Sequence, residues 1–185
     1  DAMQIERFIS EVRDEFGAIS ILVNNAGGPK VGNYQTVDSQ DWLDAYHLTL
    51  RSAVTTTELV LDDMKSAKWG RIINIASLQS TRAFENGISY GAAKGGILQL
   101  TRAMAEAWSR YGITANALAP GFFPTELTAP LFADQAAAQR LAAATAIGRN
   151  GALEDMRGPL LFLASDASGY VTGQSIAVDG GFTAK

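Results

Sequence analysis

The stretch of sequence that decides the fold is residues 77–94, SLQSTRAFENGISYGAAK, which joins an expected strand to an expected helix. The largely apolar run before it, residues 71–76, is typical of a buried strand that ends at a loop, and Ser77 follows directly. Tyr90 and Lys94 are four residues apart in the expected helix, so their side chains would lie one turn apart on the same face. A strand end and a helix face therefore meet here.

The side chains at this junction suit proton transfer. A free tyrosine titrates at about 10, and an adjacent cation stabilises the phenolate and lowers that pKa. We therefore expect Lys94 to lower the pKa of Tyr90 and to make it a proton donor and acceptor. A Ser77 hydroxyl that faces the helix would hold a substrate oxygen while Tyr90 exchanges a proton with it.

Small residues surround the tyrosine and the lysine. Each glycine inside a helix costs about 1 kcal/mol relative to alanine, so their presence indicates that something comes very close to this helix face. Either a ligand or another part of the protein would explain the close approach, and both can hold on different sides of the helix. The small residues are Gly91, Ala92, Ala93, Gly95 and Gly96.

Four motifs stand in a fixed order along the chain. They are the turn NNAG at 24–27, the set Ser77, Tyr90 and Lys94, the pair Pro120-Gly121, and the ending TGQSIAVDGG at 172–181. Together they resemble the short-chain dehydrogenase/reductase family, over essentially the whole chain. The resemblance is greatest to the branch that includes 3-oxoacyl-acyl-carrier-protein reductases and related ketone reductases.

The resemblance implies an oxidoreductase that uses NAD or NADP to interconvert a small-molecule ketone and a secondary alcohol. In that family Tyr90 would transfer the proton, Lys94 would lower its pKa and bind the ribose hydroxyls, and Ser77 would orient the substrate oxygen. A second hypothesis is a catalytically weak member that keeps the fold for binding or as a scaffold. Binding of NAD(H) or NADP(H) separates the two.

The resemblance also implies the cofactor contacts. Residues 25–27 would lie against the ribose, and Thr125 would bond the nicotinamide carboxamide. The full set of expected cofactor residues is Asn25, Ala26, Gly27, Tyr90, Lys94, Pro120, Gly121, Phe123 and Thr125. Residues 122–148 would form a lid over the substrate, with an apolar pocket lined by Phe122, Phe123, Leu127 and Leu131; a mobile surface helix is the alternative.

One position departs from the family pattern. The family places an asparagine in the helix before the catalytic strand, where it completes the catalytic set by holding a water next to the lysine. Here the matching residue is Thr49, in HLTL at 47–50, and threonine lacks the reach and the two amide donors of asparagine. The proton relay is therefore in question. His47, the single histidine, is not assigned to the site.

Periodicity predicts alternating helices and strands, hence an α/β fold. The resemblance implies that its sheet is parallel, doubly wound and Rossmann-like, with helices on both faces. In the family this part corresponds to strands four to seven. We expect helices at 1–16, 39–65, 88–110 and 153–164, with Asp1 as the first N-cap. The expected strands are 19–23, 71–76, 114–119 and 174–178, and three of their ends should converge at one sheet edge.

Composition limits the remaining classes. The 185 residues, of which 47% are hydrophobic, suit a single globular domain over 1–185. A net charge of −4 without a basic run argues against nucleic acid and anionic membrane as partners, and the absence of cysteine excludes disulfides and thiolate metal sites. We expect no metal, a cytoplasmic protein, and a homodimer or homotetramer formed through helices 42–64 and 88–108, which carry apolar residues on several sides.

The family also begins with a glycine-rich turn that cradles the pyrophosphate at a helix N-terminus, and this chain has no such motif. We therefore expect the N-terminal third of the family fold, its first three strands, to be absent from residues 1–185. The residues that separate NAD from NADP would belong to that part, so the cofactor preference is unreadable. The strand at 19–23 would become an exposed apolar edge.

Overall fold

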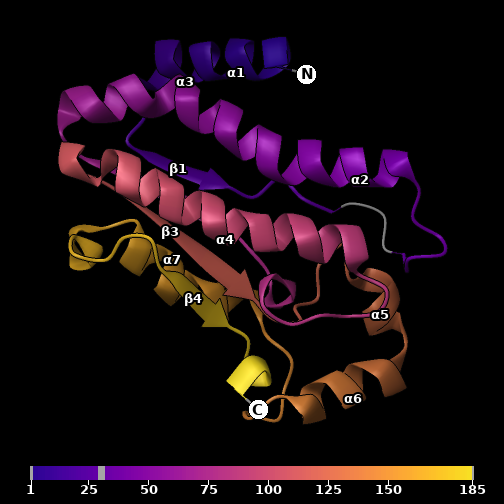
Figure 1. Ribbon diagram of the computed structural model, residues 1–185. Helices are drawn as coiled ribbons and strands as arrows, with labels where there is room; N and C mark the ends of the chain where they lie inside the picture. Colours follow the sequence, from indigo (N-terminus) through magenta and orange to yellow (C-terminus); the bar gives the residue numbers. More distant parts are fainter. Residues whose placement is uncertain (1, 29–31, 185) are drawn as a thin grey trace.

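A four-stranded parallel sheet forms the centre of the molecule (Figure 1). The computed structural model describes residues 2–28 and 32–184. The strands follow one another across the sheet in chain order, β1-β2-β3-β4. Their bounds are Ile21–Asn24 for β1, Gly70–Ile75 for β2, Ile113–Pro120 for β3 and Ser175–Val178 for β4. The predicted α/β class is confirmed, and each expected strand is present to within two residues.

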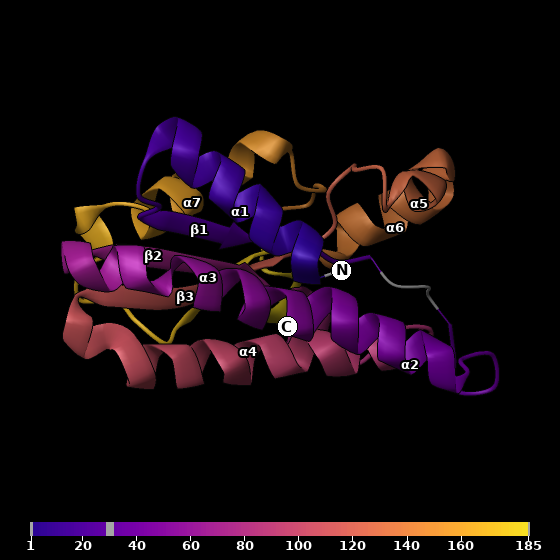
Figure 2. The same ribbon diagram turned by 90° about the horizontal axis from the view of Figure 1, so that it is seen from above.

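Helices cover both faces of the sheet (Figure 2). Helices α3 and α4 pack on one face, α7 packs on the other, and α1 lies beside the β1 edge. The bounds are Ala2–Phe16 for α1, Ser39–Ala45 for α2, Ser52–Ala67 for α3, Ile88–Trp108 for α4, Ala129–Ala133 for α5, Gln135–Ala144 for α6 and Arg157–Leu163 for α7. Asp1, the expected first N-cap, lies outside the described residues.

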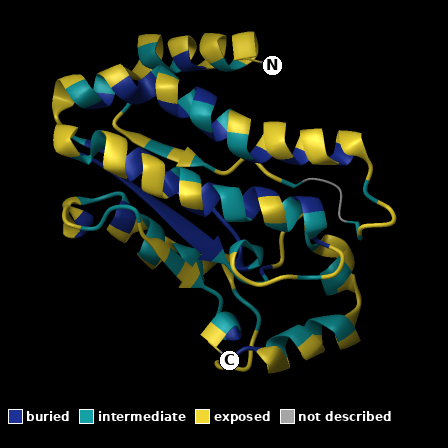
Figure 3. Cartoon of the chain, in the orientation of Figure 1, coloured by how far each residue is buried: buried dark blue, intermediate teal, exposed yellow. Residues whose placement is uncertain are grey.

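The core is built by alternation along the two central strands β2 and β3, whose residues are nearly all buried; Figure 3 shows this for β3. Ile72 faces α3 and α4 in one apolar cluster, whereas Ile73 faces α7 in another. Successive side chains of a strand point to opposite faces, so a parallel strand with helices on both sides must be apolar in both directions. The run at 71–76 meets this requirement except at Arg71 and Asn74, which are buried with their side chains hydrogen-bonded.

The long helix expected at 39–65 is continuous but not uniform. Residues Tyr46–Arg51 between α2 and α3 form a π-helix, in which the N–H of Ser52 donates to the carbonyl of His47, five residues back. The Ser52 hydroxyl also donates to the Leu48 carbonyl over 2.6 Å. A π-helical turn adds a residue to the helical repeat and is frequent at functional sites. Its presence changes which side chains face α4.

The last predicted helix is also divided, into a 3-10 helix at Leu153–Met156 and α7. Helix α1 keeps Ile9 buried, but Phe8 and Phe16 of its expected apolar stripe are exposed. Ile21 and Val23 on the outer strand β1 are exposed as well, as the sequence predicted for an edge. No helix within residues 2–28 and 32–184 is long and apolar enough to cross a membrane.

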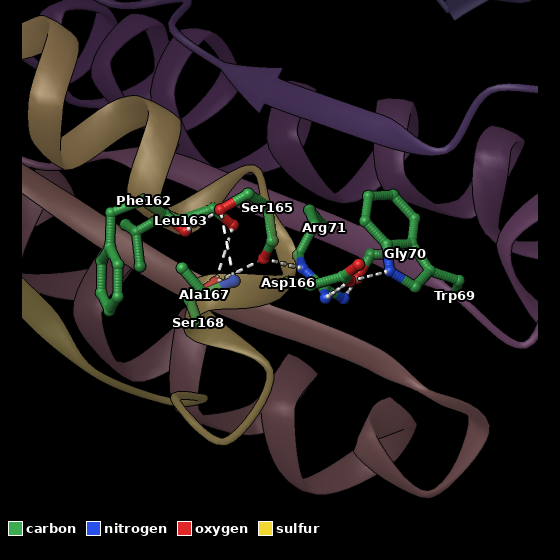
Figure 4. Close-up of polar contacts among 9 residues, drawn as sticks. All are labelled: Trp69, Gly70, Arg71, Phe162, Leu163, Ser165, Asp166, Ala167 and Ser168. Atoms are coloured by element: carbon green, nitrogen blue, oxygen red, sulfur yellow. Dashed lines mark hydrogen bonds and ion pairs between the residues drawn. The ribbon is translucent and has the colours of Figure 1, made fainter.

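A paired cation lies at the amino end of β2 (Figure 4). Arg71 is 3% exposed, and its guanidinium donates to Asp166 over 3.1 Å and to the carbonyls of Ser165 and Gly70. Trp69 completes the group, because its ring lies 4.2 Å below the guanidinium and its indole N–H donates to Asp166 over 2.7 Å. Burial lowers the pKa of Arg71 and Asp166 opposes that shift.

Candidate active site

A cleft of about 620 Å³ opens at the other end of the sheet, where the strands end. The turn after β1, the end of β2 and the residues after β3 all line it, together with one face of α4. Ligands of open α/β sheets bind at the carboxyl ends of the strands, so this is the expected place for a site. The predicted convergence of three strand ends is confirmed.

Ser77 stands at the rim of β2 with its hydroxyl held in place. It is the N-cap of the 3-10 helix Leu78–Ser80, and its Oγ accepts a hydrogen bond of 3.1 Å from the N–H of Gln79. The residue is buried, and its hydroxyl lies near enough to Tyr90 to oppose the rise in the pKa of that phenol. Because Oγ is already an acceptor for Gln79, the hydroxyl proton remains for Tyr90 or for a substrate oxygen.

Tyr90 and Lys94 lie one turn apart on α4, as the spacing predicted, and both line the cleft. Lys94 is 3% exposed, and its Nζ donates to the Ile75 carbonyl over 2.5 Å. Nζ is 5.8 Å from the centre of the Tyr90 ring. Within the described residues the ammonium has no carboxylate partner, so a buried charge remains available to a ligand.

The pKa values correct one expectation. Burial raises the pKa of Tyr90, and the hydrogen bond to Ser77 opposes this without cancelling it. Burial also lowers the pKa of Lys94 from 10.5 to about 8. The expectation of a lowered pKa for Tyr90 is therefore wrong for this structure, since desolvation of the phenol outweighs the opposing effect of Ser77.

Packing within the chain explains one of the three glycines of α4. A Cβ at Gly96 would meet Leu50 at 3.0 Å, whereas one at Gly91 or Gly95 would lie 3.5 Å or 3.6 Å from the backbone oxygens of Gln79 and Ser80, which is ordinary van der Waals contact. On the cleft side, a Cβ at Gly27 would lie 3.3 Å from Lys94 Nζ, so this glycine keeps the ammonium uncovered.

Most of the predicted cofactor residues come together in the cleft. Its lining includes Asn25, Gly27, Pro120, Gly121, Phe123 and Thr125 besides Tyr90 and Lys94. Ala26 is exposed but outside the lining. These residues fit a nicotinamide ribose, because a deep ammonium with an open approach past Gly27 is suited to hydroxyl acceptors. No group of three His, Asp or Glu residues that suits a metal ion is found in the described part of the chain.

The segment after β3 lies at the surface, since neither α5 nor α6 contains a buried residue. A lid over the substrate therefore stays a prediction. Of the four predicted pocket residues, Phe123 and Leu127 line the cleft and Leu131 does not. Phe122 instead lies 5.3 Å from Phe182, ring to ring.

Two threonines hold the base of this segment. The Thr125 and Thr128 hydroxyls lie 3.0 Å apart, and Thr128 also donates to the Phe123 carbonyl. Thr125, the residue that the resemblance pairs with the nicotinamide, is thus fixed by its neighbour.

Thr49 is buried in the π-helix and does not line the cleft. It is 2% exposed, and its Oγ1 has no hydrogen-bond partner among the described residues. An unpaired buried hydroxyl costs roughly 1–3 kcal/mol, so such a group persists where a water or a function requires it. The unassigned His47 is exposed, with its ring beside that of Tyr46.

Sequence reasoning missed part of the lining. Glu126 and Thr128 from the segment after β3, and Leu153 and Met156 from the start of the last helical segment, face the same cleft. Their positions depend on tertiary packing, which no local pattern records. The one sequence signal that could have pointed to Glu126 was its position next to Thr125.

Comparison with known proteins agrees with this geometry. The family model described as enoyl-(acyl carrier protein) reductase matches residues 1–183. The chain belongs to the short-chain dehydrogenase/reductase family. The 2-dehydro-3-deoxy-D-gluconate 5-dehydrogenase of Escherichia coli (strain K12) is 40% identical to it over 175 residues, which are 92% of this chain and 68% of that protein.

Two further relatives of this short-chain dehydrogenase/reductase show its breadth. The 3-oxoacyl-(acyl-carrier-protein) reductase of Escherichia coli is 34% identical over 98% of this chain and 73% of that protein. The crystal structure of a gluconate 5-dehydrogenase from Burkholderia cenocepacia J2315, in complex with NADP and tartrate, superposes with a TM-score of 0.95 at 39% identity and covers all of this chain and 72% of that one. The relatives thus include a reductase of the branch expected from sequence, at 34% identity, but the two gluconate-type dehydrogenases are more similar in sequence, at 40% and 39%.

Proposed function

We propose that this protein is an NAD(P)-dependent oxidoreductase that interconverts a ketone and a secondary alcohol. The observation that carries the proposal is the placement of Ser77, Tyr90 and Lys94 around one cleft at the carboxyl ends of the strands. Membership of the short-chain dehydrogenase/reductase family and the NADP-bound relative support it. Either NAD or NADP would occupy the cleft against Gly27, Gly121 and Thr125.

The nicotinamide, when bound, supplies or accepts the hydride at the substrate carbon. In reduction, the Tyr90 hydroxyl gives its proton to the carbonyl oxygen while the Ser77 hydroxyl holds that oxygen; in oxidation, the phenolate takes the proton back. The raised pKa of Tyr90 favours the protonated form needed for reduction. Ser77 acts by position, since its Oγ is fixed by Gln79.

Lys94 would hold the ribose hydroxyls with the donors that remain after its bond to Ile75. A hydroxyl acceptor would compensate part of the desolvation that depresses the lysine pKa, and this would favour the charged form. We propose that the same charge then stabilises the Tyr90 phenolate during oxidation. Thr49 would hold a water in place of the family asparagine, because its unpaired hydroxyl is buried beside α4.

The substrate we propose is a small polyhydroxy ketone or alcohol. Two relatives carry names of gluconate-type dehydrogenases, at 39% and 40% identity, against 34% for the acyl-carrier-protein reductase. Residence in the cytoplasm, a single domain over 1–185, and a homodimer or homotetramer stay predictions. The expected absence of the N-terminal third also stays a prediction; the chain spans 68% to 73% of these relatives.

Titration of the full protein with NAD(H) and NADP(H) tests the proposal. We expect one of the two to bind and its reduced form to be consumed with a polyhydroxy ketone. A protein that binds neither contradicts the proposal and favours the second candidate, a member that keeps the fold for assembly. Thr49, at the position of the family asparagine, is the feature that favours this candidate.

A further inference from the structure

Ser80 connects two residues of the proposed catalytic set. It ends the 3-10 helix Leu78–Ser80, and its hydroxyl accepts a hydrogen bond of 3.2 Å from the N–H of Ser77. The same hydroxyl donates to the backbone carbonyl of Lys94 over 2.7 Å. One side chain therefore joins the backbone of the serine to that of the lysine, across fourteen positions from Ser80 to Lys94.

The same segment also holds Lys94 at its other end. The lysine Nζ donates to the Ile75 carbonyl over 2.5 Å, so residues 75–80 bind both the head group and the backbone of Lys94. Helix α4 packs against this segment as well: a Cβ at Gly91 or Gly95 would lie 3.5 Å or 3.6 Å from the backbone oxygens of residues 79 and 80, which is ordinary van der Waals contact. The hydroxyl of Ser80 is then the polar connection across an otherwise close-packed contact.

The position of Ser77 depends on this contact. Its Oγ is fixed by Gln79 inside the 3-10 helix, so the hydroxyl moves with that helix as a unit. Tyr90 moves with α4. A slip of the 3-10 helix along α4 would change the distance between the Ser77 and Tyr90 hydroxyls even if each element kept its own shape, and a misplacement of this kind is costly in catalysis.

We propose that Ser80 is a positioning residue, whose hydroxyl keeps Ser77 in place relative to Tyr90 and Lys94. This inference rests on the proposed function. Ser80 does not line the cleft, so it touches neither substrate nor cofactor and acts through the two backbones that it joins.

The test is Ser80→Ala in the full protein, measured as alcohol oxidation over a range of pH. We expect kcat to fall about 10-fold with the cofactor KM nearly unchanged, since only the relative placement is lost. The pKa that Tyr90 gives to the rate profile should rise by about half a unit, because a weaker bond to Ser77 no longer stabilises the phenolate. Ser80→Thr keeps the hydroxyl and should keep the wild-type profile.

Ser168→Ala is the matched control. Ser168 is also a buried serine whose hydroxyl donates to backbone carbonyls, those of Leu163 and Ser165, but at the other end of the sheet (Figure 4). It should lose stability without a shift of the pH profile.

An unshifted profile in Ser80→Ala, an equal shift in Ser168→Ala, or an alanine-like shift in Ser80→Thr overturns the role of Ser80 alone. Absence of turnover in the wild type overturns the proposed function and the role of Ser80 with it.

Discussion

Strand β2 has a buried cation at each end, and the two cations differ in how many partners surround them. Arg71 at its start and Lys94 beside its last residue, Ile75, are both 3% exposed. Arg71 has a carboxylate, two carbonyls and an indole ring around it, whereas Lys94 has one carbonyl partner among the described residues. Buried charges are normally paired with an opposite charge. The carboxyl end of β2, where Lys94 has no such partner among the described residues, is therefore the end at which we expect a ligand to bind.

The largest effect should come from Tyr90→Phe, which removes the proton donor and keeps the ring. We expect turnover to fall by roughly 10²–10⁴-fold, the usual contribution of general acid-base catalysis. Tyr111→Phe is the matched control, because Tyr111 also has a lysine near its ring, Lys65 at 5.4 Å, but lies outside the cleft. Equal activity of the two variants would remove Tyr90 from the site.

Exchange of the two cations for methionine should separate function from stability. Lys94→Met should abolish turnover yet raise the free energy of unfolding by about 1–2 kcal/mol at pH 7, since a desolvated charge is replaced by apolar volume. Arg71→Met should cost about 1–3 kcal/mol, through its lost hydrogen bonds, and leave kcat within about twofold. Chemical denaturation without cofactor measures both. Similar stability changes in the two variants would refute the contrast.

The pH dependence of stability should carry the mark of Lys94. Between pH 8 and pH 10.5 the unfolded chain keeps the lysine proton and the folded chain loses it, because the folded pKa is about 8. The unfolded state then binds more protons, so the free energy of unfolding rises with pH in this window. The amount by which the free energy of unfolding of Lys94→Met exceeds that of the wild type should therefore become smaller above pH 8. A constant difference up to pH 10 would show that the pKa of Lys94 is not lowered.

The smallest effect concerns Thr49→Asn. If the threonine weakens the water path, the asparagine should raise turnover by about two- to threefold, because it restores two amide donors. Its side chain is larger, so stability is measured alongside by thermal unfolding. Thr57→Asn is a control on the same helix, where the hydroxyl is already bonded to the Ala53 carbonyl. A loss of turnover without a loss of stability would show that Thr49 is itself adapted to this site.

What the sequence revealed is local or periodic. The apolar run in residues 71–76 and the spacing of Tyr90 and Lys94 were sufficient to predict the strand and the helix, and the convergence of strand ends predicted the place of the cleft. The π-helix at Tyr46–Arg51 was not predictable, because one additional residue in a turn barely changes an apolar pattern. The pKa of Tyr90 was predicted in the wrong direction, because the depth of burial follows from tertiary packing.

The pairing of distant residues was equally hidden. Asp166 lies ninety-five positions after Arg71, and nothing in either neighbourhood marks the other. Ser80 was not predicted for a related reason: its hydroxyl acts through the Lys94 carbonyl of α4, fourteen positions away, and no local pattern marks that contact.

The aromatic contacts around Phe182 set an order of events during synthesis. Phe84, in the loop between Ser77 and Tyr90, stacks on Phe182, and Arg82 in the same loop donates to the Phe182 carbonyl over 3.2 Å. Phe182 is made one hundred residues after Arg82. At translation rates of about 5–20 residues per second, the loop waits about 5–20 s for this partner. On the ribosome, the loop beside Ser77, Tyr90 and Lys94 therefore lacks its contacts with Phe182 for several seconds after those three residues have been made.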